Sequence, residues 1–172
     1  MLEGENILCF APDPWTDIWR NRHQIMSLLA ERNRVLYVEP RLYLRQTLQM
    51  LREGRLRGAH LFGERVTGAR ANLYVYHHPL YAPISGRFPL KQITEALRLG
   101  SLRRELRRLG MARPILWLCR PEMSDLIGKF GEKLLIYHVV DEYSAYEGVA
   151  DPEAVRRRER EILGRADLVL AT

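Results

Sequence analysis

The apolar run from Leu134 to Val140 limits the fold of this chain more than any other stretch. Its sequence, LLIYHVV, is rich in β-branched and aromatic residues and does not alternate between apolar and polar positions. Such a run is typical of a strand buried on both faces, and strands of that kind occur mainly in parallel sheets covered by helices. Asp141 and Glu142 follow directly, so this strand ends in two carboxylates.

Shorter apolar runs recur along the chain and alternate with helical patterns. We expect six strands, at residues 6–11, 35–38, 72–76, 114–119, 134–140 and 167–171. Helices are expected at residues 16–32, 44–52, 89–109, 122–130 and 151–163, with a Gly- and Arg-rich loop between 52 and 70. This alternation predicts an α/β fold, a Rossmann-like doubly wound parallel sheet in the order 3-2-1-4-5-6 with helices on both faces.

Two of these helices carry distinct local signals. The tripeptide Asp151-Pro152-Glu153 is a strong helix start, because Asp caps, Pro fits the first turn and Glu faces the positive helix end. In the helix at 89–109, the spacing of Leu90, Ile93 and Leu97 predicts the apolar stripe. The stripe changes frame at Gly100-Ser101, which predicts a kink or a break there.

The bulk composition is that of one globular domain over residues 1–172. Hydrophobic residues make up 47% of the chain and charged residues 28%, which argues against disorder. The acidic N-terminus does not resemble a signal peptide, and no apolar run reaches the roughly 18 residues that span a membrane, so we expect a cytoplasmic protein. Cys9 and Cys119 are expected to be buried free thiols. The net charge of +6 suits anionic partners.

The turn after the first strand argues against the usual nucleotide-binding form of this fold. A pyrophosphate approaches the backbone there only when the turn is glycine-rich, whereas this turn reads APDPWTD. A Walker motif is also absent. The adjacent His77 and His78 would point to opposite faces of a strand, which does not suit a metal. We therefore expect neither a cofactor nor a metal.

Four segments taken together resemble the N-terminal half of a GT-B glycosyltransferase, and are most similar to the bacterial family 4 sugar transferases and their cell-surface polysaccharide relatives. They are PWTDIWRNRHQIMSLLAERNRVLYVEP (14–40), PILWLCRP (114–121), LLIYHVVDEYSAYEG (134–148) and EREILGRADLVLAT (159–172). The resemblance covers nearly the whole chain apart from residues 41–70. It implies two Rossmann-like domains across a cleft, with the acceptor on the first and the nucleotide-sugar donor on the second. The chain then lacks the C-terminal donor domain and is expected to be inactive alone.

The resemblance makes Asp141 the first catalytic candidate. It stands where many family members carry a histidine close to the reacting sugar. A carboxylate there can accept a hydrogen bond from the acceptor hydroxyl, or act as a base if the enzyme inverts. Glu142 shares the location and is the second candidate. The alternatives are a loop-bracing or helix-capping role for Asp141 and a solvated acid at Glu142.

Acceptor-binding residues are expected where the strand ends border the cleft. Trp stacks on sugar rings and Arg pairs with phosphate, so the cluster after the first strand fits a phosphorylated or lipid-linked acceptor. Ordinary packing of at least one Trp is the alternative. The main candidates are Trp15, Trp19, Arg22, His23, His77, Tyr81, Arg120 and Tyr143, and His78 is expected at the cleft rim beside His77.

The segment LRLGSLRRELRRLG (97–110) places five arginines beside leucines. This amphipathic pattern suits peripheral contact with the anionic inner face of a membrane, and the alternative is the solvated face of a crossover helix. A nucleic-acid-binding module would need a contiguous basic face interleaved with aromatics, so nucleic acid is not an expected partner.

We therefore expect the acceptor-side domain of a hexosyltransferase-like enzyme. It would transfer a sugar from a nucleotide-sugar donor to a hydroxyl acceptor in polysaccharide or glycoconjugate synthesis. The alternatives are a domain of a sugar-nucleotide epimerase, which shares the two-domain architecture, and a basic non-enzymatic module.

Overall fold

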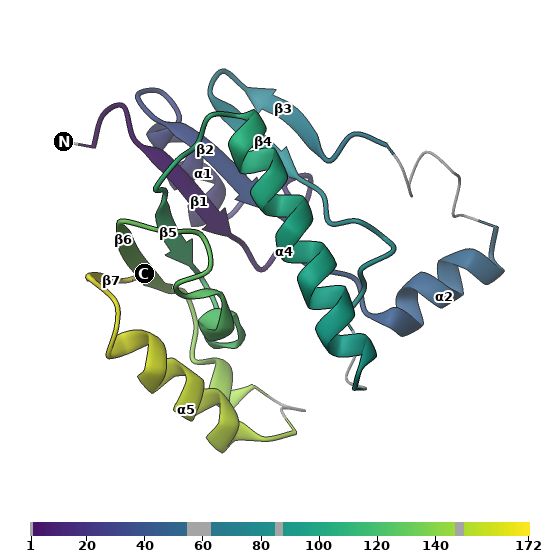
Figure 1. Ribbon diagram of the computed structural model, residues 1–172. Helices are drawn as coiled ribbons and strands as arrows, with labels where there is room; N and C mark the ends of the chain where they lie inside the picture. Colours follow the sequence, from purple (N-terminus) through teal and green to yellow (C-terminus); the bar gives the residue numbers. More distant parts are fainter. Residues whose placement is uncertain (1, 55–62, 85–87, 147–149) are drawn as a thin grey trace.

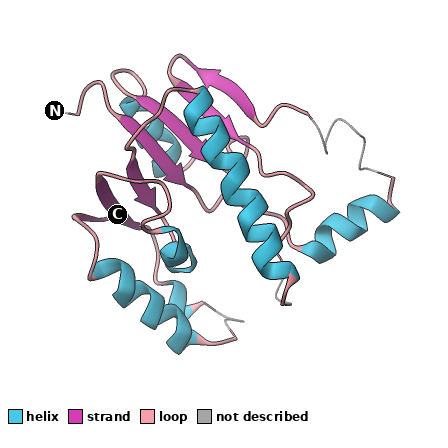
Figure 2. Ribbon diagram, viewed as in Figure 1, coloured by secondary structure: helices cyan, strands magenta, loops and turns pink. Residues whose placement is uncertain are grey.

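The computed structural model describes residues 2–54, 63–84, 88–146 and 150–172. Within these residues, seven strands form one sheet in the order β3-β4-β2-β1-β5-β6-β7, flanked by helices (Figures 1 and 2). The strands are β1 (Asn6–Phe10), β2 (Arg34–Val38), β3 (Val66–Arg70), β4 (Leu73–Tyr76), β5 (Ile115–Leu118), β6 (Leu134–Val139) and β7 (Leu168–Ala171). The helices are α1 (Asn21–Leu29), α2 (Leu44–Arg52), α4 (Leu90–Arg108) and α5 (Pro152–Leu163), with 3₁₀ turns η1 (Pro121–Leu126) and η2 (Tyr143–Ala145). The predicted α/β class is confirmed.

The sheet is parallel from β4 to β7, and its order matches the predicted one with one strand added. The addition is β3, which pairs antiparallel with the edge strand β4 in a region predicted to be a loop. The prediction was wrong because VTGAR is a half-exposed edge strand with no apolar run of its own. Asn72, in the left-handed region at φ 60°, closes the hairpin, a conformation that Asn tolerates better than most residues.

Successive residues of the central strands face two separate cores. Leu8 packs in a cluster with Leu102 of α4 and Ile162 of α5. Its neighbour Ile7 packs on the opposite face, in a cluster with Met26 of α1. All five side chains are fully buried. Burial on both faces explains why these strands do not alternate in sequence, and it confirms the doubly wound arrangement.

Two of the helices begin where the sequence predicted. Helix α2 has the predicted bounds, and α5 begins at the predicted start signal. The Asp151 carboxylate accepts a hydrogen bond from the backbone N–H of Ala154 at 2.9 Å. The first helix begins later than predicted, at Asn21, because Asp17 accepts from the backbone N–H of Ile18 and holds a turn that leaves Ile18 exposed. The expected helix at 122–130 is the shorter turn η1.

Helix α4 differs from its prediction in two ways. It runs without a break across Gly100-Ser101, and Leu90, Ile93 and Leu97 are exposed. Its buried face consists of Thr94, Arg98, Ser101, Leu102, Glu105 and Leu106. The first half of α4 packs on the polar loops after β2 and β4 rather than on the sheet, so apolar spacing identified the wrong face.

The chain order of the strands reverses at the parallel pair β1 and β5, from which the sheet extends in both directions. In open α/β sheets, ligands bind at this point, in the crevice beyond the carboxyl ends of the strands. In Figure 1 this edge faces the space between α4 and α5, and α2 projects from the body beside the start of α4. Cys9 and Cys119 are buried free thiols, as predicted. None of the described helices is both long and apolar enough to cross a bilayer.

Candidate functional site

A cavity of about 460 Å³ opens at the carboxyl edge of the sheet, where the strand order reverses. Its floor is formed by the segments that follow β1, β2, β4 and β5, and its walls by α4 and η1. The lining includes Pro12, Glu39, Arg41, His78, Lys91, Glu95, Arg98, Arg120, Glu122, Asp125 and Arg158. Its size is that of a small-molecule site. A second hollow of about 420 Å³ lies at the opposite edge, near Met111, away from the strand ends that bind ligands in this fold.

Two buried arginines share one carboxylate in the cavity wall. The side chains of Arg41 and Arg98 are only 8% and 7% exposed, and both pair with Glu95. Arg98 donates to Glu95 Oε2 from Nε at 3.0 Å and from Nη2 at 2.6 Å. Arg41 donates to Glu95 Oε1 and, through Nη2, to the carbonyls of Ala82 and Pro83 at 3.0 Å each. This network ties α4 to the loops after β2 and β4.

The arginines set the protonation of their neighbours. Burial raises the pKa of the Glu95 carboxyl, but the charges and hydrogen bonds of Arg98 and Arg41 outweigh burial and leave that pKa below its usual value. Burial, with the same two positive charges, holds the pKa of the His78 imidazole well below its usual value. Arginine stays charged at any physiological pH. At pH 7 the wall therefore holds two guanidinium groups, one carboxylate and a neutral imidazole.

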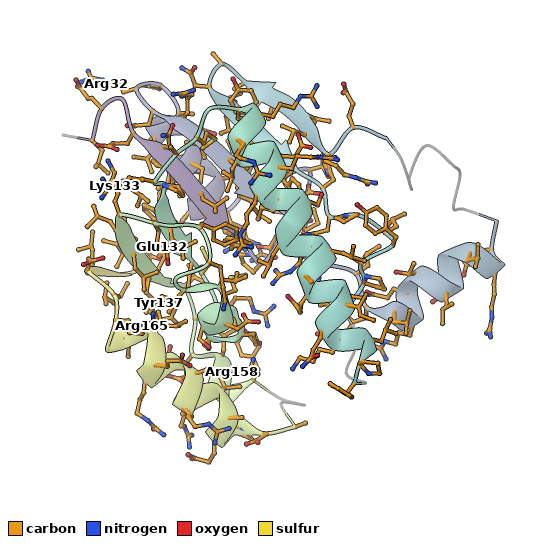
Figure 3. All side chains as sticks on the ribbon, in the orientation of Figure 1. Arg32, Glu132, Lys133, Tyr137, Arg158 and Arg165 are labelled. Atoms are coloured by element: carbon orange, nitrogen blue, oxygen red, sulfur yellow. The ribbon has the colours of Figure 1, made fainter. Side chains whose placement is uncertain are left out.

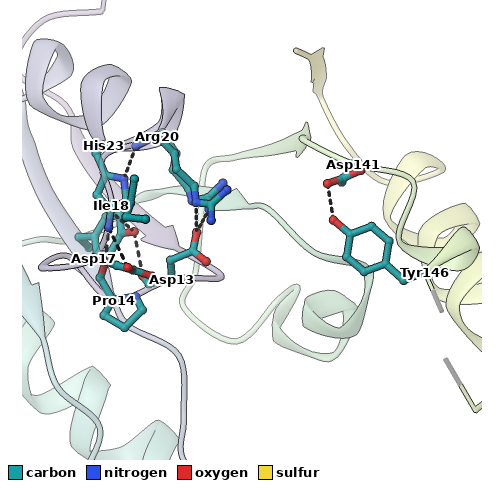
Figure 4. A network of polar contacts seen from close by, with 10 residues as sticks. Asp13, Pro14, Asp17, Ile18, Arg20, His23, Asp141 and Tyr146 are labelled. Atoms are coloured by element: carbon teal, nitrogen blue, oxygen red, sulfur yellow. Dashed lines mark hydrogen bonds and ion pairs between the residues drawn. The ribbon is translucent and has the colours of Figure 1, made fainter. Parts of the chain in front are cut away.

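Asp141 is exposed two residues after the end of β6. Figure 4 shows Tyr146 pointing at it, and the Tyr146 hydroxyl donates to Asp141 Oδ2. The other oxygen, Oδ1, accepts from the backbone N–H of Glu142 at 3.2 Å. Glu142 is also exposed, and it accepts from the Ser144 hydroxyl. Neither carboxylate lines the cavity.

Arg120 connects the two parts of this edge. It lines the cavity, where it pairs with Glu122 at 3.0 Å. Its guanidinium also lies 5.0 Å from the ring centre of Tyr143, four residues beyond the end of β6. Tyr143 is buried, so Arg120 covers the ring rather than leaving its face open. The cavity and the Asp141 carboxylate are thus neighbouring parts of one strand-end surface.

The loop after β1 forms an aromatic cluster. Trp15 lies against Trp19 and Tyr37, with ring centres 5.6 Å and 5.0 Å away. Trp15 is half-buried in this packing, whereas Trp19 is 47% exposed and has the guanidinium of Arg70 at 5.0 Å from its ring centre. Trp15 therefore has the ordinary packing role that was the alternative to acceptor binding. Trp19 is the residue of the aromatic cluster whose ring surface is open to solvent.

Arg22 and His23 lie behind this loop, away from its exposed side. Arg22 is buried and pairs with Asp13, so its charge is already matched within the protein. His23 is fully buried, accepts from the backbone N–H of Arg20 at 3.1 Å, and contacts the carbonyl of Pro14 at 3.3 Å (Figure 4). Burial lowers the pKa of His23. In this structure both residues hold the loop together, and their contact with an acceptor stays a prediction.

The end of β4 presents its side chains differently from the prediction. His77 contacts Glu39 Oε2 through Nδ1 at 2.8 Å and the Thr67 hydroxyl through Nε2 at 3.0 Å. The cavity is lined by the next residue, His78. Tyr81 is exposed but carries the guanidinium of Arg65 at 5.6 Å from its ring centre and does not line the cavity. His77 therefore braces loops at the rim.

Sequence reasoning placed His78 at the cleft rim, and it lines the cavity, but missed Arg41, Glu95 and Arg98 as site residues. Arg41 follows a strand directly, so the strand-end rule could have found it. Arg98 and Glu95 gave no such signal, because their helix was expected to bury its other face. Within residues 97–110, Leu102 and Leu106 are buried and Leu99 and Leu109 pack against the same core, whereas Leu97 is exposed. This packing favours the solvated-face alternative, and membrane contact stays a prediction.

Searches against models of protein families and against curated proteins found no match to this chain. Within the described residues, no three His, Cys, Asp or Glu side chains are grouped as metal ligands. The site is therefore argued from its geometry and charges.

Proposed function

We propose that this chain is the acceptor-side domain of a GT-B glycosyltransferase, an enzyme that moves a sugar from a nucleotide-sugar donor to an acceptor hydroxyl in polysaccharide or glycoconjugate synthesis. The observation that carries the proposal is the pairing, at one edge of the sheet, of a ligand-sized cavity with an exposed carboxylate at a strand end. A group transfer between two substrates needs both, because one substrate must be held while its hydroxyl is activated.

Asp141 is the residue that acts on the acceptor hydroxyl. Its carboxylate accepts a hydrogen bond from that hydroxyl as the oxygen attacks the anomeric carbon. The bond from that carbon to the nucleoside diphosphate breaks, and the diphosphate leaves with the electron pair. When the configuration of the sugar inverts, Asp141 takes the proton. Tyr146 positions the carboxylate, and Asp141 raises the Tyr146 pKa by accepting its hydrogen bond, so the phenol stays a donor.

Two further features suit a sugar acceptor. Trp19 exposes nearly half of its surface beside the strand ends, and Trp rings stack on the apolar faces of sugars. Arg120 stands between the cavity and Tyr143, where it can donate to an acceptor that spans both. The donor itself would be held by a second domain that is not part of this sequence.

We also propose that the protein is cytoplasmic and rests on the inner face of an anionic membrane. The contact surface is on α2 and the first half of α4, not on residues 97–110. Leu48, Leu51 and Ile93 are among its exposed apolar side chains, and Leu51 is 60% exposed. Arg45 and Arg52 flank the apolar face of α2. Helices with this arrangement bind at the boundary between headgroups and acyl chains.

The full-length protein tests the proposal. A screen of nucleotide sugars with hydroxyl acceptors should find transfer by the wild type, and Asp141→Asn should lower the rate by about 10²- to 10⁴-fold. Unchanged activity in Asp141→Asn would remove this carboxylate from the chemistry. Conversion of the nucleotide sugar without any acceptor would instead support the epimerase alternative.

A further inference from the structure

The cavity wall carries more buried positive charge than it neutralises. Arg41 and Arg98 are both more than nine-tenths buried, and among the described residues the carboxylate that pairs with them is that of Glu95. A charge removed from water is stable only with an opposite partner and satisfied hydrogen bonds. The two guanidiniums share the one negative charge of Glu95, which leaves one positive charge without a direct partner. The pair of arginines therefore attracts a further anion.

The other acids of the lining are placed elsewhere. Both carboxylate oxygens of Glu39 are in use, Oε1 by the backbone N–H of Trp15 and Oε2 by His77. Glu122 pairs with Arg120 at 3.0 Å. Asp125, on η1, is exposed, and within the described residues it forms no ion pair with Arg41 or Arg98, although its charge acts on both guanidiniums from a distance. Glu95 is therefore the acid in direct contact with the two arginines among the described residues.

The remaining lining adds positive charge rather than removing it. Lys91 of α4 lines the cavity, as does Arg158 of α5, which Figure 3 labels. His78 is neutral because burial and the two arginines lower its pKa. Anions that approach this opening therefore meet cations at its rim and at its base.

Three polar atoms of the lining are buried without a partner among the described residues. Two are donors, the Nε–H groups of Arg41 and Arg120. The third is Nδ1 of His78, which accepts hydrogen bonds because the ring donates to the backbone of Glu39. Unsatisfied buried polar atoms are rare in proteins and mark positions where a ligand or ordered water completes the site.

From these observations we infer that the cavity binds the phosphoryl group of a phosphorylated polyol or sugar. A phosphate monoester carries nearly two negative charges and three acceptor oxygens, which match the surplus charge and the two free Nε–H donors. The guanidinium fork fits phosphate oxygens in pairs. A hydroxyl next to the phosphate would donate to His78 Nδ1. Arg22, the phosphate ligand expected from the sequence, is held by Asp13, and Arg41 with Arg98 takes that role.

As the acceptor subsite of a glycosyltransferase, this site rests on the proposed function, whereas as an anion site it stands on its own geometry. The two ideas can fail separately. Phosphate binding without sugar transfer would leave the anion site and remove the transferase. Sugar transfer without phosphoryl binding would leave the transferase proposal and remove the anion site.

The test is calorimetric titration of the protein with glycerol 3-phosphate at low salt, with glycerol as the uncharged control. Three variants are compared with the wild type: Arg98→Gln, Glu95→Gln and Arg104→Gln. Arg104 is the matched control, because it is on the same helix with an exposed side chain outside the cavity. Its removal changes the net charge by the same amount as that of Arg98.

We expect glycerol 3-phosphate to bind the wild type and glycerol not to bind. Arg98→Gln should weaken binding by about 10- to 100-fold, because one of the two buried positive charges is lost and Glu95 then neutralises the other. Arg104→Gln should change it by less than about 2-fold. Glu95→Gln should strengthen binding, because both arginines then lack a counter-charge. Arg98→Gln keeps the neutral Arg41–Glu95 pair, so its melting temperature should stay near that of the wild type.

Equal affinity of Arg98→Gln and Arg104→Gln for glycerol 3-phosphate would overturn the inference, as would equal binding of glycerol. If Arg98→Gln fails to fold, the double variant Lys91→Gln, Arg158→Gln replaces it. Both of its positions are exposed at the opening, so folding should be unaffected and binding should weaken by about 3-fold or more. No weakening in that variant would again overturn the inference.

A second arm identifies the source of the phosphoryl group. Vesicles of phosphatidylcholine with phosphatidic acid are sedimented with wild-type and Arg98→Gln protein. A loss of sedimentation in Arg98→Gln that exceeds the loss in Arg104→Gln assigns the phosphoryl group to a lipid headgroup. Equal sedimentation of the two variants, with the calorimetric difference retained, assigns it to a soluble phosphorylated acceptor.

Discussion

The carboxyl edge of the sheet holds two charged clusters that differ in burial. In the cavity, Glu95 is enclosed by Arg41 and Arg98, whose side chains are almost wholly buried. At the end of β6, Asp141 is exposed and held only by Tyr146 and a neighbouring backbone N–H. The same strand-end rule points to both regions. The difference shows that burial commits a charged group to partners, whereas exposure leaves it free to react.

The difference in burial between Glu95 and Asp141 is tested most directly by removing the charge of each carboxylate in turn. Glu95→Gln leaves two buried guanidiniums without a counter-charge and should lower the free energy of unfolding by about 3–5 kcal/mol. Asp141→Asn, at an exposed position, should change it by less than about 0.5 kcal/mol. Urea unfolding of both variants measures this. Similar losses in the two would show that Glu95 is not enclosed as the structure has it.

A second test concerns the two faces of α4. Leu102 is fully buried against the sheet, so Leu102→Ala should lower the free energy of unfolding by about 3 kcal/mol through lost burial and a cavity. Leu97 is half-exposed, so Leu97→Ala is its matched control and should lower it by less than about 0.5 kcal/mol. Denaturation that ranks the two leucines in the opposite order would restore the stripe expected from sequence.

The buried titratable groups should also make the stability of the fold sensitive to acid. The pKa of His78 and that of His23 are lowered in the folded state from about 6.5, so the unfolded chain binds protons first as the pH falls. Stability should therefore decrease below about pH 6.5, by up to about 1.4 kcal/mol per pH unit for each histidine. Glu95, with a lowered pKa, adds a further loss only at lower pH, as its carboxylate is protonated.

His78→Gln isolates this contribution. The variant should lose less stability between pH 7 and pH 5 than the wild type, and His23 should account for the remainder. Chemical denaturation at several pH values measures the slope. A slope identical to that of the wild type would mean that His78 is not held neutral by its surroundings.

The smallest expected effect concerns the outer surface of α2. Leu51→Gln should weaken sedimentation with vesicles that contain phosphatidylserine by a few-fold, because one apolar side chain is lost from the proposed contact. Leu163→Gln, at an exposed leucine on α5, is the matched control and should have no effect. Equal loss in both variants would place the membrane contact elsewhere or nowhere on α2.

Much of the architecture followed from local chemistry. Strands buried on both faces could be recognised from runs such as LLIYHVV, and Asp151 marked a helix start that its hydrogen bond to Ala154 confirms. The edge strand β3 could not be recognised, because a half-exposed strand needs no apolar run. Helix α4 was assigned the wrong buried face, because the burial of the charged Arg98 depends on Glu95, which in turn pairs with Arg41 from a distant segment.

The sequence by itself determined the strand order, the doubly wound layers and the place of Asp141 at a strand end, since these depend on local hydrophobicity and on short-range turn chemistry. Only the tertiary structure decided which arginines are held internally and which line the cavity. Arg22 is bound by Asp13, while Arg41 meets Glu95 across 54 residues of sequence. Such ion pairs form only when the fold brings distant segments together, so residue type alone does not predict them.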